Sequence, residues 1–295
     1  MFTQKICIGA ALLSAMSLAC AAEGGGSSYP QGVENFLSGA LPPPGLYGLV
    51  YANDYRADRL NDQDGNNLNV PGFKVHANAI VPRLVWVGDS TVLGGNVVLH
   101  AIVPLVDLKV SAGGATQSKS GLGDITLGAG LAYHHSPQLH SIPALNMTFP
   151  TGGYTQGDLA NIGRNYGAVE AMYAVSYIDP NGFNGDIRLG YLFNQRNKAT
   201  DYRSGQEFHF DYAVGWGLGN GWTAGLGGYY KQQTTLDKQA GAELADSKSS
   251  GMAIGPSLKY DSGKGWFLTA KWQVESHVKN GSQGHALWLK AIFPL

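Results

Sequence analysis

Two carboxylates and an imidazole, Glu207, His209 and Asp211, lie within five consecutive positions of the chain. Groups of these types bind metals or transfer protons in many proteins. They alternate strictly with three aromatic residues: Phe208, Phe210 and Tyr212. This alternation predicts a β-strand with one polar and one apolar face. Side chains at i and i+2 of a strand lie ~7 Å apart, so one strand rarely closes a tight ligand set, and we predict no metal here.

The composition of the chain limits the kind of protein in which these residues lie. Charged residues make up only 14% of the 295 residues, against roughly 25% in an average soluble protein. The 42 glycines are about twice the usual share of ~7%. The formal net charge is −1, so no basic face favours nucleic acid as a partner.

The first 22 residues have the pattern of a secretory signal peptide. Lys5 precedes an apolar run from Ile6 to Cys20, and small residues follow. A lipoprotein signal usually has Leu three positions before its cysteine, where this chain has Ser17, so lipidation of Cys20 is left open. We expect residues 1–22 to be cleaved, 23–44 to form a periplasmic or plug segment, and 45–295 to form the main domain.

Period-two alternation dominates beyond residue 44, and no later segment has 18 consecutive apolar residues. The pattern predicts twelve strands of about ten residues each. They are expected near 45–56, 73–87, 91–107, 121–134, 139–149, 167–178, 184–195, 206–218, 222–233, 250–260, 265–277 and 285–295.

The expected connections alternate between short turns and long polar loops along the whole chain. Short turns such as Asp179-Pro180-Asn181-Gly182 carry strong turn residues. The long connections are expected at 57–72, 108–120, 150–166, 196–205, 234–249 and 278–284. A soluble sandwich has no reason to sort its loops in this way, whereas an outer-membrane barrel has short periplasmic turns and long external loops. We therefore predict an all-β fold, a closed antiparallel transmembrane β-barrel of about twelve strands.

The sequence around residues 219–221 predicts how the two strands of one hairpin pair with each other. A three-residue turn at 219–221 (Gly-Asn-Gly) places Leu218 opposite Trp222, and all the apolar residues then share one face. A slip by one residue would exchange the two faces. In this register His209 lies opposite Lys231, and Asp211 lies opposite Tyr229.

The inward faces of the predicted barrel supply the candidate site. Seven residues are expected to line the lumen or a substrate path: Arg188, Glu207, His209, Asp211, Tyr229, Lys231 and Lys271. They could form a hydrogen-bonded ion network in a wet lumen, or a constriction that selects solutes. Toward the turn the same face becomes small, at Ala213, Gly215 and Gly217. These small residues could make room for residues 31–44 or for a substrate.

A hydrolase is the catalytic alternative to a channel that only transports its substrate. Three histidines and a serine flank one short turn: His134, His135, His140 and Ser141. No G-x-S-x-G nucleophile motif is present, and this turn is expected at the periplasmic end. We therefore predict a protein that is not an enzyme, with no catalytic residue, no cofactor and no metal.

Several longer stretches resemble one family. They include FLSGALPPPGLY (36–47), KSGLGDITLG (119–128), DLANIGRNY (158–166), SYIDPNGFN (176–184), DYRSGQEFHFDYAVGWGLGNGW (201–222), GPSLKYDSGKGWFLTAKWQ (255–273) and ALWLKAIFPL (286–295). The chain resembles the proteobacterial outer-membrane family named for a meta pathway of phenol degradation. More distantly it is similar to outer-membrane transporters of fatty acids and aromatic hydrocarbons, which are longer and carry a larger N-terminal hatch.

The resemblance implies an outer-membrane barrel that transports hydrophobic or aromatic compounds, and no catalytic residues come with it. We therefore expect passive uptake of such compounds, with outer-membrane lipids and the barrel-assembly machinery as partners. A general diffusion channel for small polar solutes is the alternative. An outer-membrane hydrolase or a purely structural barrel is a third reading. The pattern leaves the oligomeric state open.

Overall fold

The computed structural model describes residue 23 and residues 26–295, and the predicted signal peptide at 1–22 lies outside the described residues. Within the described part, no helix is long and apolar enough to cross a membrane. The strands are β1 (Gly45–Asn61), β2 (Lys74–Val92), β3 (Gly95–Ile102), β4 (Leu105–Ala112), β5 (Ala115–Leu122), β6 (Ile125–His134), β7 (Leu139–Phe149), β8 (Ala168–Tyr177), β9 (Phe183–Asn194), β10 (Arg196–Asn197), β11 (Tyr202–Arg203), β12 (Glu207–Gly217), β13 (Trp222–Gln233), β14 (Lys238–Gln239), β15 (Ala242–Glu243), β16 (Ser250–Asp261), β17 (Phe267–Lys279) and β18 (Gly281–Pro294).

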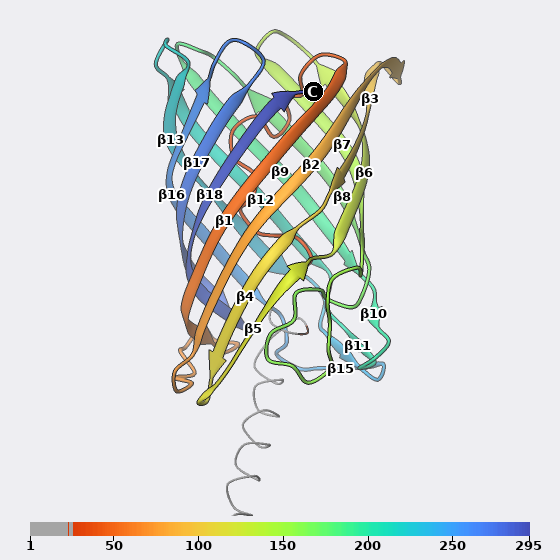
Figure 1. Ribbon diagram of the computed structural model, residues 1–295, viewed down its shortest axis with the longest axis vertical. Coiled ribbons are helices and arrows are strands. Elements are labelled where there is room, and N and C mark those ends of the chain that lie inside the picture. The colour runs from red at the N-terminus through yellow and green to blue at the C-terminus, as the bar shows by residue number, and fades with distance from the viewer. Residues whose placement is uncertain (1–22, 24–25) are drawn as a thin grey trace, which may run out of the picture.

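Fourteen of these strands form one antiparallel sheet, which closes on itself because β1 pairs with both β18 and β2. Strands β3 and β4 follow one another along β2, and β5 and β6 follow one another along β4 and β3, so the closed wall has twelve strands rather than fourteen. The predicted all-β transmembrane barrel is confirmed (Figure 1). The short strands β10, β11, β14 and β15 form a separate small sheet among the long loops, at the lower end of the barrel in Figure 1.

The two faces of the wall follow the alternation of the sequence. On β12 the inward residues Glu207, His209 and Asp211 are buried, whereas Val214 and Trp216 on the outer face are exposed. Large apolar residues are exposed on the outer face of the other strands as well, among them Leu84, Leu127, Leu145, Ile254, Leu268 and Leu289. Only lipid tails give such a surface a favourable environment, so the wall is that of an outer-membrane barrel.

The wall differs from the expected pattern at residues 103–122. The run predicted as one strand at 91–107 divides at Val103 and Pro104, because Pro104 has no backbone N–H to donate to the ladder. The long loop predicted at 108–120 is instead the β4–β5 hairpin, which turns at Gly113 and Gly114 with φ of 60° and 86°. The alternation did not indicate these strands because most of their exposed residues are polar, such as Asp107 and Lys109. Similarly, β17 and β18 extend through most of the loop predicted at 278–284.

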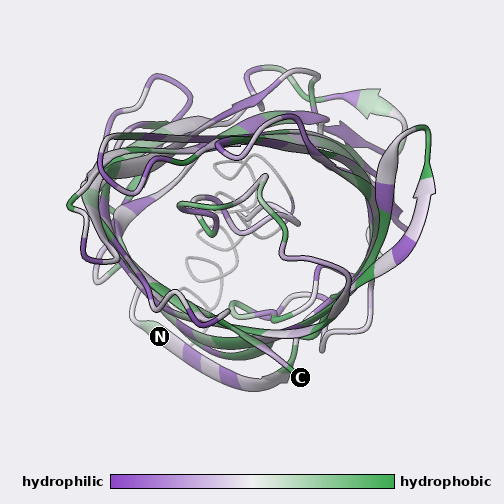
Figure 2. Ribbon diagram, turned by 90° about the horizontal axis from the view of Figure 1, so that it is seen from above, coloured by the Kyte–Doolittle hydropathy of each residue, from purple (hydrophilic) through white to green (hydrophobic). Residues whose placement is uncertain are grey.

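Residues 26–44, here called the plug segment, lie inside the barrel. At the long-loop end, Glu23 accepts hydrogen bonds from Tyr154 and Asn197 of the loops. From there the chain runs through the lumen toward the short-turn end, where β1 begins. The view down the barrel shows this segment enclosed by the wall (Figure 2).

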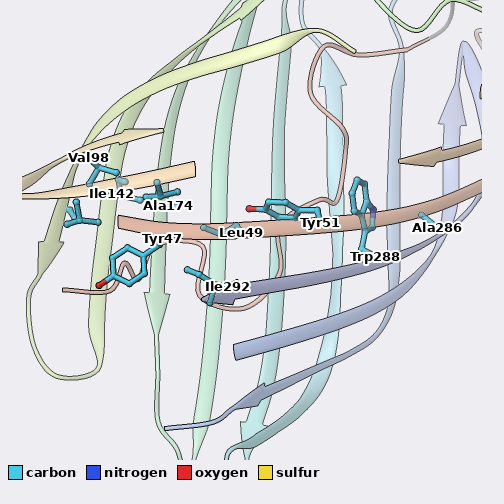
Figure 3. Packing of buried hydrophobic residues seen from close by; sticks show 12 residues of the cluster. Tyr47, Leu49, Tyr51, Val98, Ile142, Ala174, Ala286, Trp288 and Ile292 are labelled. Atoms are coloured by element: carbon cyan, nitrogen blue, oxygen red, sulfur yellow. The ribbon is translucent and has the colours of Figure 1, made fainter. Parts of the chain in front are cut away.

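An apolar cluster lines the inner wall toward the short-turn end. Its core consists of Tyr47, Leu49, Tyr51, Val85, Val87, Val98, Ala132, Ile142, Ala174, Ala286, Trp288 and Ile292. Figure 3 shows side chains from β1, such as Leu49 and Tyr51, beside Trp288 and Ile292 of β18. Val33 and Leu41 of the plug segment pack against this cluster. The lumen therefore has an apolar side in addition to the polar side that the sequence predicts.

Candidate functional site in the barrel lumen

The register predicted for the β12–β13 hairpin is confirmed. His209 pairs with Lys231 and Asp211 pairs with Tyr229, and the N–H of Leu218 donates to the carbonyl of Trp222 at 2.8 Å. Gly219 and Gly221 of the turn adopt φ of 79° and 85°, which glycine accommodates without strain. The polar faces of β12 and β13 thus meet inside the barrel.

Asp211 binds the plug segment. It accepts a 2.6 Å hydrogen bond from the hydroxyl of Tyr29, and further bonds from the backbone N–H groups of Gly32 at 2.9 Å and Glu34 at 2.8 Å. Gly32 has a φ of 75°, and a Cβ at that position would lie 2.3 Å from the side-chain amide of Gln273. The chain therefore needs glycine where it curves around this carboxylate.

A buried ion network lies behind Tyr29. Glu170 of β8 accepts a 2.8 Å bond from Arg188 of β9, and Nε2 of His209 lies 3.0 Å from its other oxygen. The ring of Tyr29 stacks on His209 with centroids 4.2 Å apart, and the guanidinium of Arg188 lies 4.3 Å from the same ring centre. Tyr29 is thus held by an aromatic ring, a cation and a carboxylate of the wall.

A second ion cluster surrounds Glu34 of the plug segment. Its carboxylate lies 3.2 Å from Arg83 of β2 and 3.0 Å from Lys290 of β18, and it accepts a 3.0 Å bond from Tyr51. The carbonyl of Glu34 accepts a 2.6 Å bond from Lys271. With its N–H bond to Asp211, Glu34 therefore contacts five residues of the barrel wall.

Asp186 of β9 fixes the end of the plug segment nearest the short turns. It accepts bonds from the backbone N–H groups of Leu37 at 2.7 Å and Ser38 at 2.8 Å, and another from the Ser38 hydroxyl. Leu37 has a φ of 68°, which is strained for a side chain with a Cβ. The two charge-assisted bonds around it offset that strain.

Phe36 fills the space that the small residues of β12 leave. Its side chain is 1% exposed, and a Cβ on Gly215 would lie 2.9 Å from its Cζ. The small face predicted at Ala213, Gly215 and Gly217 therefore accommodates a plug residue.

The structure brings most of the seven predicted residues to the plug segment rather than to one another. Glu207 accepts bonds from Ser27 at 2.8 Å and Gln31 at 2.6 Å, whereas Lys231 remains 3.9 Å away. Tyr229 is turned to Glu275 of β17, to which it donates at 2.6 Å. Most of the seven predicted residues therefore hold the plug segment, and a role for them in a substrate path stays a prediction.

A cavity of about 450 Å³ lies in the lumen beside the plug segment. Apolar side chains of the wall contribute much of its lining, among them Val81, Val106, Leu108, Ile142, Met172 and Phe267. Its polar lining includes Arg83, His100, Asn146, Glu170 and Arg188. The cavity also touches Pro104 and Gly123, where β5 and β6 meet β4 and β3.

The wall is incomplete beside that junction. Strand β5 pairs with β4 only, and its other edge faces the 150–166 loop rather than β7. Lys119 of β5 forms a 2.6 Å ion pair with Asp158, and Gln117 accepts a 2.9 Å bond from the N–H of Ala160. Loop side chains therefore cover an edge that elsewhere in the barrel is closed by strand pairing.

Four residues of the lumen network were missed by the sequence interpretation: Glu34, Arg83, Glu170 and Lys290. The alternation carried a signal for two of them. Arg83 interrupts an inward apolar row of Val81, Val85 and Val87, and Lys290 interrupts one of Trp288 and Ile292. A charge on an apolar inward row requires a buried partner, and here the partner is Glu34.

The histidine-rich turn contains a serine–histidine pair, with Nε2 of His135 2.8 Å from Oγ of Ser141. Nδ1 of His134 lies 2.8 Å from Nδ1 of His140. Among the described residues, no carboxylate orients His135, and no group of three or more His, Cys, Asp or Glu side chains could hold a metal ion.

The chain is similar in fold to several outer-membrane barrels. It matches the COG4313 outer membrane channel from Pseudomonas putida F1 with a TM-score of 0.76 and 19% sequence identity, over 87% of this chain and 97% of that chain. It matches the CymD monoaromatic hydrocarbon channel with a TM-score of 0.46 and 10% identity, over 85% of this chain and 91% of that chain. No curated protein matches the chain.

The sequence also matches one family over residues 57–291, which is most of the barrel. The matched range begins within β1 and ends within β18, so it contains all the wall residues described above as holding the plug segment except Tyr51. The resemblance seen in the sequence motifs is thereby confirmed. The chain belongs to the family described as "Putative MetA-pathway of phenol degradation".

Proposed function

We propose that this protein is an outer-membrane channel for the passive uptake of small hydrophobic or aromatic compounds. The observation that carries the proposal is the cavity of about 450 Å³ beside the plug segment, which has a largely apolar lining. It touches the junction of β4, β5 and β6, where loop side chains rather than a paired strand cover the edge of β5. A hydrophobic molecule gains by leaving water for such a lining, whereas a hydrated ion does not. The channel names of similar structures agree with this proposal.

The lumen supports hydrophobic rather than polar cargo. Glu207 and Asp211 of the predicted polar path are occupied by donors of the plug segment, and so is Asp186 on the same inner wall, which leaves little of this path free for a sugar or an ion. A general diffusion channel would leave these groups to water. We propose that residues 1–22 are an export signal, that the plug segment stays in place during passage, and that the barrel-assembly machinery inserts the wall.

Uptake of 1-N-phenylnaphthylamine tests this function, because an intact outer membrane excludes this fluorescent aromatic molecule. Cells that produce the protein should gain fluorescence faster than cells carrying an empty vector. Ala144→Phe places a ring in the cavity and should abolish the gain. Ala129→Phe is the matched control, because Ala129 is exposed on the outer face of the neighbouring strand β6.

Equal uptake by cells with and without the protein would contradict the proposal, provided that the barrel is present in the outer membrane. Faster entry of small sugars with no change in dye uptake would support the diffusion channel instead. Labelling of Ser141 by a fluorophosphonate would support the hydrolase. The three measurements therefore distinguish the hydrophobic channel, the diffusion channel and the hydrolase.

A further inference from the structure

The cavity has a polar pole lined by three cations of the wall: Arg83, Arg188 and Lys290. Glu170 pairs with Arg188, and Arg83 and Lys290 share Glu34. Two further carboxylates lie close to this pole: Asp211 bonds to Tyr29, on whose ring Arg188 lies, and Asp186 bonds to Leu37, next to the Phe36 carbonyl that Lys290 holds. Arg83 has only the shared Glu34 as a carboxylate partner among the described residues. A buried donor without a partner is costly, so a ligand that brings an acceptor to Arg83 has an advantage here.

Arg83 has donors to spare. Its Nη1 donates to Glu34 at 3.2 Å and to Tyr51 at 3.1 Å. Its Nε is buried and has no hydrogen-bond partner among the described residues. Both of these bonds use Nη1, which leaves Nη2 open toward the cavity that Arg83 lines. An arginine presents such a pair of donors in a planar fork that fits the two oxygens of a carboxylate. The buried Nη1 of Arg188 is unpartnered in the same way.

Apolar surface adjoins this pole. Val81 stands two positions before Arg83 on the same inward row, and Val106, Ile142 and Met172 line the same cavity. A ligand that satisfies both parts needs a hydrophobic body and an acidic end. Glu34 already shows the recognition chemistry, since its carboxylate sits against Arg83 and Lys290 at the end of a short aliphatic chain.

We infer that the cavity binds small hydrophobic acids, with the carboxylate at Arg83 and the apolar body against the wall of β2, β4 and β7. The inference rests on the proposed uptake function and narrows its substrate class. A neutral alcohol of the same shape fits the apolar part but offers the Arg83 guanidinium a single oxygen and no charge. The acid is therefore preferred over the alcohol.

Isothermal titration calorimetry on the full chain in lipid nanodiscs tests the inference with two probes of equal length, 4-phenylbutyrate and 4-phenylbutanol, at pH 7.5. The acid should bind at least tenfold more tightly than the alcohol. Arg83→Gln should weaken the acid at least tenfold and change the alcohol less than threefold. Arg83→Lys keeps the charge without the planar fork, so it should retain part of the preference.

Arg196→Gln is the matched control, because Arg196 forms an exposed ion pair with Asp201 in the loop sheet and should leave both affinities unchanged. If the alcohol binds as tightly as the acid, or if Arg83→Gln keeps the preference, the inference is overturned. Dye uptake distinguishes that result from failure of the function. Uptake that persists without an acid preference removes only the inference, whereas loss of dye uptake and of binding by both probes removes both proposals.

Discussion

The hydroxyl of Tyr29 donates a 2.6 Å hydrogen bond to Asp211, which follows it by 182 positions in the sequence. This contact joins the plug segment to a strand in the last third of the chain. Asp211 also accepts hydrogen bonds from two backbone N–H groups of the plug segment. The wall therefore fixes the backbone of the plug segment as well as its side chains. Plug and barrel are therefore one folded unit, and single wall residues control how firmly the plug is held.

Asp211→Asn should loosen the plug segment. The amide is neutral and turns one acceptor into a donor, so at least one of the three donors at Asp211 loses its partner. Bonds to a charged group contribute about 1.5–3 kcal/mol each. We expect the single-channel conductance in planar bilayers to rise several-fold. Asp201→Asn, in an exposed loop ion pair, should not change it, and equal conductance of the two variants would show that Asp211 does not hold the plug.

Phe36→Ala should release the plug without opening the barrel wall. The removed ring is fully buried, and truncations of this kind cost about 3–5 kcal/mol in protein cores. No ladder hydrogen bond involves Phe36, so the loss falls on the plug. Hydrogen exchange of the amides of Gly32, Glu34, Leu37 and Ser38 should quicken by about 100-fold or more.

Phe293→Ala is the control for this experiment, because the ring of Phe293 is 39% exposed on the outer face of β18. It removes a ring of the same size from the lipid side. Plug amides should exchange at the wild-type rate in that variant. Unchanged exchange in Phe36→Ala would mean that the polar contacts alone keep the plug in place.

Glu170→Gln should destabilise the whole barrel. The substitution leaves Arg188 and His209 buried beside a neutral amide, and breaking a buried pair in this way costs about 3–5 kcal/mol. Urea unfolding from lipid vesicles should show a loss of that size. Glu243→Gln breaks the exposed pair with Lys238 and should cost less than about 1 kcal/mol. Equal losses in both variants would show that the Glu170 network contributes no special stability.

Most of the wall could be predicted from the sequence, because the alternation within a strand shows which residues face lipid and which face the lumen. The register of β12 and β13 could be read from the Gly-Asn-Gly turn and the positions of Trp216 and Trp222 alone. This worked because a slip of one residue would place charged side chains in lipid. Fold and register are thus local properties, repeated strand by strand.

The partners of the lumen charges could not be read in the same way. Alternation shows that Asp211 faces inward, but it does not show which of many inward groups it meets. Asp211 and Asp186 accept hydrogen bonds from backbone N–H groups of the plug segment. Every residue except proline has such a group, so the sequence does not show which of them binds a given carboxylate. The β4–β5 hairpin was missed because its exposed outer face is polar, with Asp107 and Lys109 of β4 opposite Ser120 and Ser118 of β5.

Acidification should detach the 150–166 loop from the edge of β5. The hydrogen bond from Lys119 lowers the pKa of Asp158 from its usual 3.8, so the ion pair contributes fully above that value. Its contribution is lost as the pH falls through the lowered pKa, where Asp158 becomes protonated. Cleavage by pepsin near Tyr154 and Leu159 should therefore increase from pH 5 toward pH 2, relative to Asp158→Asn measured in parallel. That variant lacks the ion pair at every pH, so it should already be cleaved rapidly at pH 5. If wild type and variant are cleaved alike across the range, the Lys119–Asp158 pair does not hold the loop over the edge of β5.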